Sequence, residues 1–272
     1  MNVSNVKLVT ANNIMSNKHL LNEKKKNSGL HIAIIGIDGS GKSSCYSDVL
    51  EKVSQRKVAA IGDEVFISQK GKLIKPRVRY LNLKLFLSKR VKNIKNRTLY
   101  KILKLTELIL RVKVQDKVIK KYQPELILTD GSPLINTLAW GNFYLSDIYS
   151  KKLCIEVLGY MIGKNIPWSR KYFLIKKIPE IFLINFLRVR FQNPDVVFFL
   201  KVSPEVSLQR ISMRSKEKQV HENKEFLKGL QQAYKIVCDI LKTNTEINNI
   251  DTDNKTIKEV SNIISNRIYE NN

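Results

Sequence analysis

The chain has 272 residues, of which 43% are hydrophobic, and it carries a formal net charge of +24. This length and composition are typical of one globular α/β domain with insertions, and no run of about 18 uncharged apolar residues predicts a membrane-spanning helix. Cys45, Cys154 and Cys238 show no metal-ligand spacing, and three thiols do not suggest a disulfide framework. We therefore expect a reducing compartment and a cytoplasmic location.

The first part of the chain, residues 1–30, is rich in Asn and Lys and lacks a compact apolar segment. This composition predicts a disordered N-terminal arm and argues against a secretory signal. The segment also has few acids, so an organellar presequence remains the alternative interpretation.

The next segment predicts a buried strand over residues 31–36, a glycine-rich loop and a helix that starts near Ser44. The loop matches the pattern G-x-x-x-x-G-K-[ST] in full. Its backbone N–H groups and the positive end of the helix are suited to hold phosphate oxygens. We expect Lys42 to reach the β- and γ-phosphates of ATP and the Ser43 hydroxyl to bind Mg²⁺. The predicted ATP-binding residues of the loop are Gly36, Gly39, Ser40, Gly41, Lys42, Ser43 and Ser44.

The remaining predicted elements alternate between strands and helices, which indicates a doubly wound, mainly parallel sheet of the α/β class. Strands are expected within 57–68 and at 126–130, 196–200 and 247–250. Helices are expected over 81–121 (one or two, basic and amphipathic), 152–163, 203–214, 224–242 and 256–269. The apolar side of the 81–121 helices is expected to hold Leu99, Ile102, Leu103, Leu105, Leu108, Ile109 and Val112.

The positive charge is concentrated in two segments. Residues 66–121 contain 18 Lys or Arg and two acids, which gives +16, and residues 164–190 contain seven Lys or Arg and one acid, which gives +6. Such basic amphipathic segments can contact an anionic membrane surface or nucleic acid. The alternative is that the lysines only solvate the polar faces of amphipathic helices.

Two acidic residues lie at or just after the ends of predicted strands, where a carboxylate can serve a phosphate-binding site. Asp130 ends the strand 126–130, where a carboxylate can hold Mg²⁺ directly or through water, or can cap a turn. Asp38 lies inside the glycine-rich loop. It can contact a substrate hydroxyl or orient the acceptor, or it can serve the tight turn alone.

Two arginines, Arg210 and Arg214, are one helical turn apart and precede a polar segment. Phosphoryl transfer requires positive charge over the moving group, often from a lid that excludes water. We interpret the pair as lid arginines, with a solvated basic helix face as the alternative.

Three stretches together resemble the thymidylate kinase family: Asp38 to Ser44, then Leu128 to Asp130 with Asn136 to Trp140, and then Pro194 to Glu205 followed by Arg210 and Arg214. The resemblance covers residues 31–268. It implies a P-loop kinase domain with a five-stranded, mainly parallel sheet and assembly as a homodimer. We interpret the two basic segments as helical insertions into this domain, at about 66–121 and 164–191. The implied reaction transfers the γ-phosphoryl group of Mg²⁺-ATP to a nucleoside monophosphate, with dTMP as the first candidate.

The resemblance also implies roles for individual residues. Asp38 matches the acidic loop residue near the acceptor sugar, and Asp130 matches the acid that opens an Asp-Arg-Tyr motif. Asp251 matches a position near the adenine of ATP. With Arg210 and Arg214 leading into the lid, the implied catalytic residues are Asp38, Lys42, Arg210 and Arg214, and the metal ligands are Ser43 and Asp130.

The chain departs from the family pattern on the acceptor side. Gly131 and Ser132 stand where the family has Arg and Tyr. Trp140 and Gly141 stand where the family has the Tyr-Gln pair that holds a thymine base. Loss of a buried arginine–phosphate contact removes about 1.5–3 kcal/mol unless another cation replaces it; candidates are Lys70, Lys72, Arg77 and Arg79. Two alternatives therefore remain. One is a P-loop kinase for another small acceptor (a nucleoside, a sugar or another hydroxyl compound), and the other is a non-catalytic nucleotide-dependent module that docks on anionic surfaces.

Overall fold

The computed structural model describes residues 29–91, 94, 96–145, 150–213 and 223–270. Residues 1–28 of the predicted N-terminal arm and Arg214 lie outside the described residues, whereas Leu30, placed in the arm by the sequence, is the first residue of the first strand. No helix in these ranges is both long enough and apolar enough to cross a bilayer.

The centre of the fold is a sheet with the strand order β4-β3-β2-β5-β1-β6-β7. The strands are β1 (Leu30–Gly36), β2 (Val58–Ile61), β3 (Val65–Gln69), β4 (Lys72–Ile74), β5 (Leu126–Asp130), β6 (Val196–Lys201) and β7 (Glu246–Asp251). The strands β2, β5, β1, β6 and β7 are parallel, whereas β3 and β4 extend one edge in antiparallel pairs. The mainly parallel α/β sheet is thus confirmed.

The expectation of five strands is wrong, because the sheet has seven. The two additional strands arise from tight turns after β2. Lys70 and Gly71 connect β3 to β4 with φ angles of 51° and 76°, and positive φ at both central residues is typical of a two-residue hairpin turn. The segment 57–68, expected to hold one strand, therefore contains β2 and nearly all of β3.

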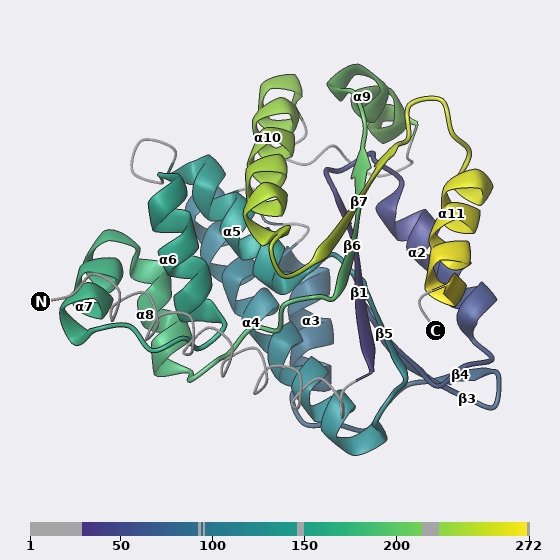
Figure 1. Ribbon diagram of the computed structural model, residues 1–272, viewed down its shortest axis with the longest axis horizontal. Helices are drawn as coiled ribbons and strands as arrows, with labels where there is room; N and C mark the ends of the chain where they lie inside the picture. The colour runs from purple at the N-terminus through teal and green to yellow at the C-terminus, as the bar shows by residue number, and fades with distance from the viewer. Residues whose placement is uncertain (1–28, 92–93, 95, 146–149, 214–222, 271–272) are drawn as a thin grey trace, which may run out of the picture.

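Helices cover both faces of the sheet (Figure 1). They are α2 (Lys42–Val53), α3 (Leu81–Val91), α4 (Arg97–Tyr122), α5 (Pro133–Tyr144), α6 (Lys151–Met161), α7 (Trp168–Lys177), α8 (Pro179–Phe186), α9 (Pro204–Ser212), α10 (Lys224–Leu241) and α11 (Ile257–Glu270). Helices α2 and α11 lie on one face, and α4, α5, α6 and α10 lie on the other. The doubly wound arrangement is therefore confirmed.

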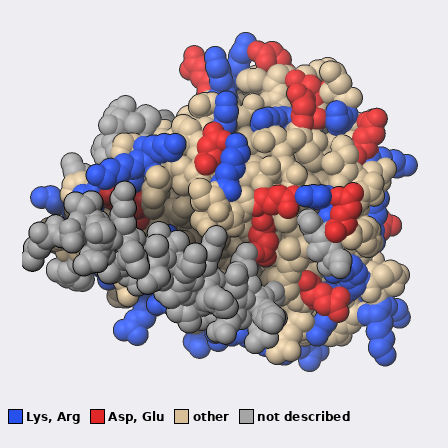
Figure 2. Space-filling model, viewed as in Figure 1, with Lys and Arg blue, Asp and Glu red and all other residues tan. Residues whose placement is uncertain are grey.

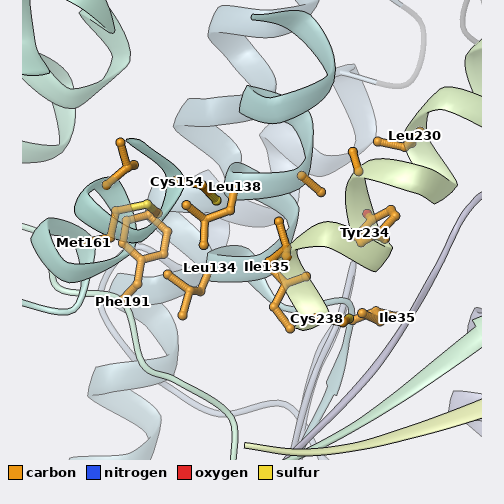
Figure 3. Close-up of a cluster of buried hydrophobic side chains, with 14 of the residues drawn as sticks. Ile35, Leu134, Ile135, Leu138, Cys154, Met161, Phe191, Leu230, Tyr234 and Cys238 are labelled. Carbon is orange, nitrogen blue, oxygen red and sulfur yellow. The ribbon is translucent and has the colours of Figure 1, made fainter. Parts of the chain in front are cut away.

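Successive side chains of β1 point to opposite faces of the sheet and pack into two separate parts of the core. Ile32 and Ile34 pack with α2 and α11, whereas Ala33 and Ile35 pack with α5 and α10, because successive strand side chains point to opposite faces. Figure 3 shows the second cluster, in which Ile35 lies beside Ile135 of α5 and Tyr234 and Cys238 of α10. This packing holds the carboxyl end of β1 between the two helical layers.

The buried side of α4 is shorter than the sequence predicts. Leu105, Leu108, Ile109 and Val112 are buried as expected, but Leu99 is 48% and Ile102 55% exposed. The exposed pair lies in the first two turns, while the part of α4 from Val114 onward packs against β2, β3 and β5. The basic segment 66–121 therefore contributes β3 and β4 to the sheet and α4 to the layer that covers it.

The start of α9 agrees with the sequence, and its end differs. The Ser203 side chain accepts a hydrogen bond from the Val206 N–H, with Pro204 in the first turn, as expected of an N-cap followed by proline. The helix ends at Ser212, before Arg214.

Candidate functional site

The glycine-rich loop joins β1 to α2 and requires glycine at defined positions. Gly39 and Gly41 have φ angles of 79° and 84°, a region that residues with a Cβ rarely adopt. A Cβ on Gly39 would also lie 2.6 Å from the backbone oxygen of Ser207 in α9. Gly41 caps α2 without a side-chain hydrogen bond. The amino end of a helix is suited to hold an anion, as at other phosphate-binding helix ends.

Within the loop, the Lys42 ammonium lies next to a carboxylate. Lys42 Nζ is 2.9 Å from Asp38 Oδ1 and 3.3 Å from the Ile37 carbonyl oxygen. The side chains of Lys42 and Asp38 are 24% and 31% exposed. This ion pair holds the ammonium group of the predicted phosphate-binding lysine beside the loop.

The first turn of α2 meets the end of β5. Ser43 Oγ donates a hydrogen bond to Asp130 Oδ2 across 2.9 Å. The other carboxylate oxygen, Asp130 Oδ1, is buried and has no hydrogen-bond partner in the described part of the chain. The structure brings these two predicted metal ligands together.

This donor set fits Mg²⁺. The ion prefers oxygen ligands and is usually held by one or two carboxylates together with substrate phosphates and water. Ser43 and Asp130 supply a hydroxyl and a carboxylate, and the unpartnered Asp130 Oδ1 remains for a metal-bound water. Among the described residues, no group of three or more His, Cys, Asp or Glu could hold a metal by itself.

Arg210 contacts backbone oxygens on two sides of the loop. Its Nη2 donates to the Thr252 carbonyl oxygen across 2.6 Å, and its Nη1 lies 3.5 Å from the Gly39 carbonyl oxygen. Ser207 Oγ of the same helix donates to the Asp38 carbonyl oxygen across 2.6 Å. Helix α9 is thereby fastened to the phosphate loop, and a role for Arg210 toward the phosphoryl group stays a prediction.

The predicted adenine-side residue lies at the same sheet edge as the loop. Asp251 ends β7, Gly36 ends β1 and Asp130 ends β5, and the three strands are parallel. Asp251 is exposed, and its Oδ1 accepts a hydrogen bond from the Asp253 N–H across 3.0 Å. In open parallel sheets, ligands bind outside the carboxyl ends of the strands.

A buried arginine, Arg111 of α4, lies against Asp130. Its Nη1 donates to the Asp130 carbonyl oxygen across 2.8 Å. Its Nε donates to Glu107 Oε1 across 3.2 Å, and its Nη2 donates to Glu107 Oε1 and Asp63 Oδ1 across 3.0 and 3.3 Å. Because Arg111 is only 3% exposed, these contacts fix its guanidinium under the end of β5.

Two lysines complete this buried charge cluster. Lys104 Nζ is 3.0 Å from Glu107 Oε2, and Lys84 Nζ donates to the carbonyl oxygens of Gly62 and Asp63. Burial acts to raise the pKa of Glu107, but the nearby cations, led by Arg111, hold it well below the usual range. Burial, together with the charge of Arg111, lowers the pKa of Lys84 to about 7.

No motif in the sequence predicted the charge cluster of Lys84, Lys104, Glu107 and Arg111. The available signal was Glu107, one of only two acids in residues 66–121, placed four residues before an arginine on the apolar side of a helix. The cations suggested as replacements for the missing family arginine are all exposed, on or after the β3–β4 hairpin; these are Lys70, Lys72, Arg77 and Arg79. Their role toward an acceptor phosphate stays a prediction, and the structure adds a buried cation, Arg111 of α4, that contacts the Asp130 carbonyl oxygen.

Aromatic side chains from α4, α5 and α10 pack together near Asp38. Trp140 stacks on Tyr100 at a centroid distance of 5.7 Å and meets Phe226 edge-on at 6.2 Å. Burial, and next the charge of Asp38, raise the pKa of both Tyr100 and Tyr234. This aromatic group therefore lies within electrostatic reach of the loop carboxylate.

Gly131, which stands where the family has arginine, occupies a backbone conformation suited to glycine. Its φ is 74°, and a Cβ there would lie 3.0 Å from Asn136 Nδ2. Asn136 Oδ1 in turn accepts a hydrogen bond from the Tyr234 hydroxyl across 2.9 Å. An arginine at position 131 would therefore not fit this backbone conformation without strain.

Comparisons with known proteins agree with this arrangement. The sequence profile described as thymidylate kinase matches residues 177–264. A solved thymidylate kinase from Candida albicans superimposes with a TM-score of 0.53 at 17% identity, over 90% of this chain and 92% of that one. A deoxyadenosine kinase from M. mycoides solved with bound dATP superimposes with a TM-score of 0.51 at 17% identity, over 88% of this chain and 98% of that one. No curated protein matches the sequence significantly.

These superpositions show a shared fold, and the profile match adds a sequence relationship over residues 177–264. Together they support a nucleotide kinase. The chain therefore has the fold of the P-loop nucleotide kinases, and its residues 177–264 match the thymidylate kinase family.

Proposed function

We propose that the chain is an ATP-dependent kinase that transfers the γ-phosphoryl group to a nucleoside monophosphate, with dTMP as the first acceptor to test. The observation that carries the proposal is the contact of 2.9 Å between Ser43 Oγ and Asp130 Oδ2 beside the phosphate loop. It places a hydroxyl, a carboxylate and the Lys42 ammonium around the start of α2. This is the combination that phosphoryl transfer from a nucleoside triphosphate requires.

The residues of the loop divide the work between binding and positioning. The N–H groups at the start of α2 would bind the phosphates, and Lys42 would exchange its contact with Asp38 for the β- and γ-phosphates. Bound Mg²⁺ would neutralise charge on the phosphate oxygens. Asp38, released from Lys42, would then be placed to orient an acceptor hydroxyl or sugar.

A second candidate is a kinase whose acceptor carries no phosphate, such as a deoxynucleoside. Arg111 is the buried cation at Asp130, and its hydrogen bonds go to Glu107, Asp63 and the Asp130 carbonyl oxygen. An arginine committed in this way is poorly placed to bind the phosphate of a monophosphate acceptor. This observation favours a nucleoside.

An acceptor panel separates these possibilities. The full chain would be incubated with Mg²⁺-ATP and, in separate reactions, dTMP, dUMP, thymidine and deoxyadenosine, and the phosphorylated product would be measured by chromatography. We expect dTDP from dTMP. Product from a nucleoside but not from dTMP would establish the second candidate, and ATP binding without product from any acceptor would contradict both.

A further inference from the structure

A cavity of about 330 Å³ lies within the peripheral part of the molecule formed by α6, α7 and α8. In Figure 1 these helices lie at the end of the molecule opposite α11. Four of the lining residues are cations, Lys164, Lys171, Arg188 and Arg190, and no Asp or Glu is among those described. The concentration of positive charge around one small cavity indicates an anion as its ligand.

The backbone around the cavity is shaped to bring these cations together. Arg188 has a φ of 49°, a left-handed conformation that is uncommon for a residue with a Cβ. Gly163 has a φ of 86°, and a Cβ there would lie 3.0 Å from the Arg190 Nε. Glycine at this position therefore leaves space for the Arg190 side chain beside Lys164. Backbone conformations of this kind are often found at ligand sites.

The helices beside the cavity expose large apolar side chains. Phe182 and Phe186 of α8 are 57% and 69% exposed, and Tyr172 of α7 is 61% exposed. The rings of Phe182 and Phe186 stack at a centroid distance of 6.1 Å and an interplanar angle of 17°. Exposed aromatic groups beside a basic cavity are typical of helices that lie at a membrane interface.

The charge of this region also differs from that of the right-hand part of the face in Figure 2. Figure 2 shows Lys and Arg interspersed with Asp and Glu over the right-hand part of the face in view. In contrast, residues 164–190 contain seven Lys or Arg and a single acid, Glu180. One of the seven, Arg170, is paired with Glu156 across 2.6 Å, and four of the others line the cavity.

We propose that the α7–α8 surface, defined by the four cavity cations and by Tyr172, Phe182 and Phe186, docks onto an anionic phospholipid membrane. A lipid phosphate occupies the cavity, and the exposed aromatic side chains lie among the headgroups. Surface attraction between the cations and anionic lipids brings the chain to the membrane. The proposal is independent of the phosphotransfer proposed above.

Two observations favour a membrane over nucleic acid. The two phenylalanines stack on one another, so part of each ring face is already covered and is less suited to stack on a base. The cavity volume of about 330 Å³ lies at the small end of small-molecule sites. It accommodates one phosphorylated headgroup better than an extended polynucleotide backbone.

Sedimentation of the full chain with vesicles tests the proposal. One set of vesicles contains phosphatidylcholine alone, and the other contains equal parts of phosphatidylcholine and phosphatidylglycerol. We expect binding to the anionic vesicles only, weakened about tenfold or more in R188N/R190Q and also weakened in F182Q/F186Q. Asn at position 188 suits the left-handed backbone, so the first variant removes charge without adding strain.

The matched control is K57Q/K258Q, which removes the same charge from exposed lysines outside this region. We expect it to bind anionic vesicles like the unaltered chain. Equal binding to both kinds of vesicle, an equal loss in the control, or binding of RNA but not of vesicles would overturn the proposal. Thermal melting verifies that each variant is folded, and if R188N/R190Q is not folded, F182Q/F186Q decides the outcome.

Discussion

Ser43 Oγ and Asp130 Oδ2 lie 2.9 Å apart, although 87 residues separate them in the sequence. The contact follows from the sheet, because β1 and β5 are adjacent parallel strands in which Ile34 is paired with Asp130. The carboxyl ends of the two strands therefore meet where the phosphate loop begins. One side chain from the loop and one from the neighbouring strand form the proposed metal site.

Removal of the Asp130 charge is expected to impair catalysis mainly through Mg²⁺. Asp130→Asn preserves the size of the side chain but removes the negative charge, so we expect kcat/KM to fall by about 100-fold or more, with partial recovery at high Mg²⁺. Activity measured across an Mg²⁺ titration tests this. Asp116→Asn is the control, because Asp116 lies on α4 and accepts a hydrogen bond from Gln192 instead. An unchanged Mg²⁺ dependence in Asp130→Asn would contradict the metal assignment.

The phosphate loop is expected to be intolerant of a single methyl group at Gly39. In Gly39→Ala the alanine has to adopt a left-handed backbone conformation, and its Cβ lies 2.6 Å from the Ser207 backbone oxygen. We therefore expect this variant to lose about 2 kcal/mol or more of folding stability and to lose ATP binding. Gly71→Ala is the control, because its φ of 76° is similar but its Cβ meets only the side chain of Gln55. ATP binding and thermal melting distinguish the two variants. Normal ATP binding by Gly39→Ala would show that the loop has another conformation.

Local patterns predicted the parts of the fold that depend on local physics. The apolar run 31–36 is β1, and Ser203 with Pro204 starts α9, because strand hydrophobicity and helix capping are properties of neighbouring residues. The Lys70-Gly71 turn is also a local feature. The sequence did not predict the hairpin, because the turn lies in a basic segment with weak β propensity. The count of strands was wrong for this reason.

Long-range contacts could not be predicted in the same way. Arg111 contacts Asp63, 48 residues away, and Asp130, 19 residues away, and no periodicity in the sequence relates these positions. The chain has 48 Lys and Arg, so a single cation carries little signal. The phosphate loop could be predicted because its residues, 36–44, are contiguous in the sequence, whereas the charge cluster around Arg111 is assembled from side chains of α3 and α4 and from residues that follow β2 and end β5.

The buried Glu107 is expected to be essential for folding stability. Glu107→Gln leaves Arg111 without its main counter-charge, and loss of one partner of a buried ion pair costs about 3–5 kcal/mol. Chemical denaturation measures the free energy of unfolding. Glu205→Gln, which breaks the exposed pair with Lys224, is the control and should leave stability unchanged. A similarly small effect of Glu107→Gln would show that the cluster contributes little.

The lowered pKa of Lys84 predicts a specific dependence of stability on pH. Its pKa is about 7 in the folded chain and 10.5 ordinarily, so between these values the unfolded chain binds a proton that the folded chain does not. The free energy of unfolding should therefore rise with pH across this window. Relative to Lys84→Met, which does not titrate, we expect an increase of about 2 kcal/mol over two pH units. Parallel curves for the two proteins would show that Lys84 remains charged when buried.

The most direct test of the proposed kinase activity follows the γ-phosphate itself. ATP radiolabelled at the γ-position would be incubated with dTMP and Mg²⁺. Lys42→Ala is the variant expected to be inactive. Lys52→Ala is the control, because Lys52 forms an ion pair with Asp48 of the same i,i+4 kind as the pair of Lys42 with Asp38. We predict that label appears in dTDP with the unaltered chain and with Lys52→Ala, and that Lys42→Ala lowers the rate by about 100-fold or more. Label that never reaches dTMP, or that reaches it equally with Lys42→Ala, would contradict the proposed reaction.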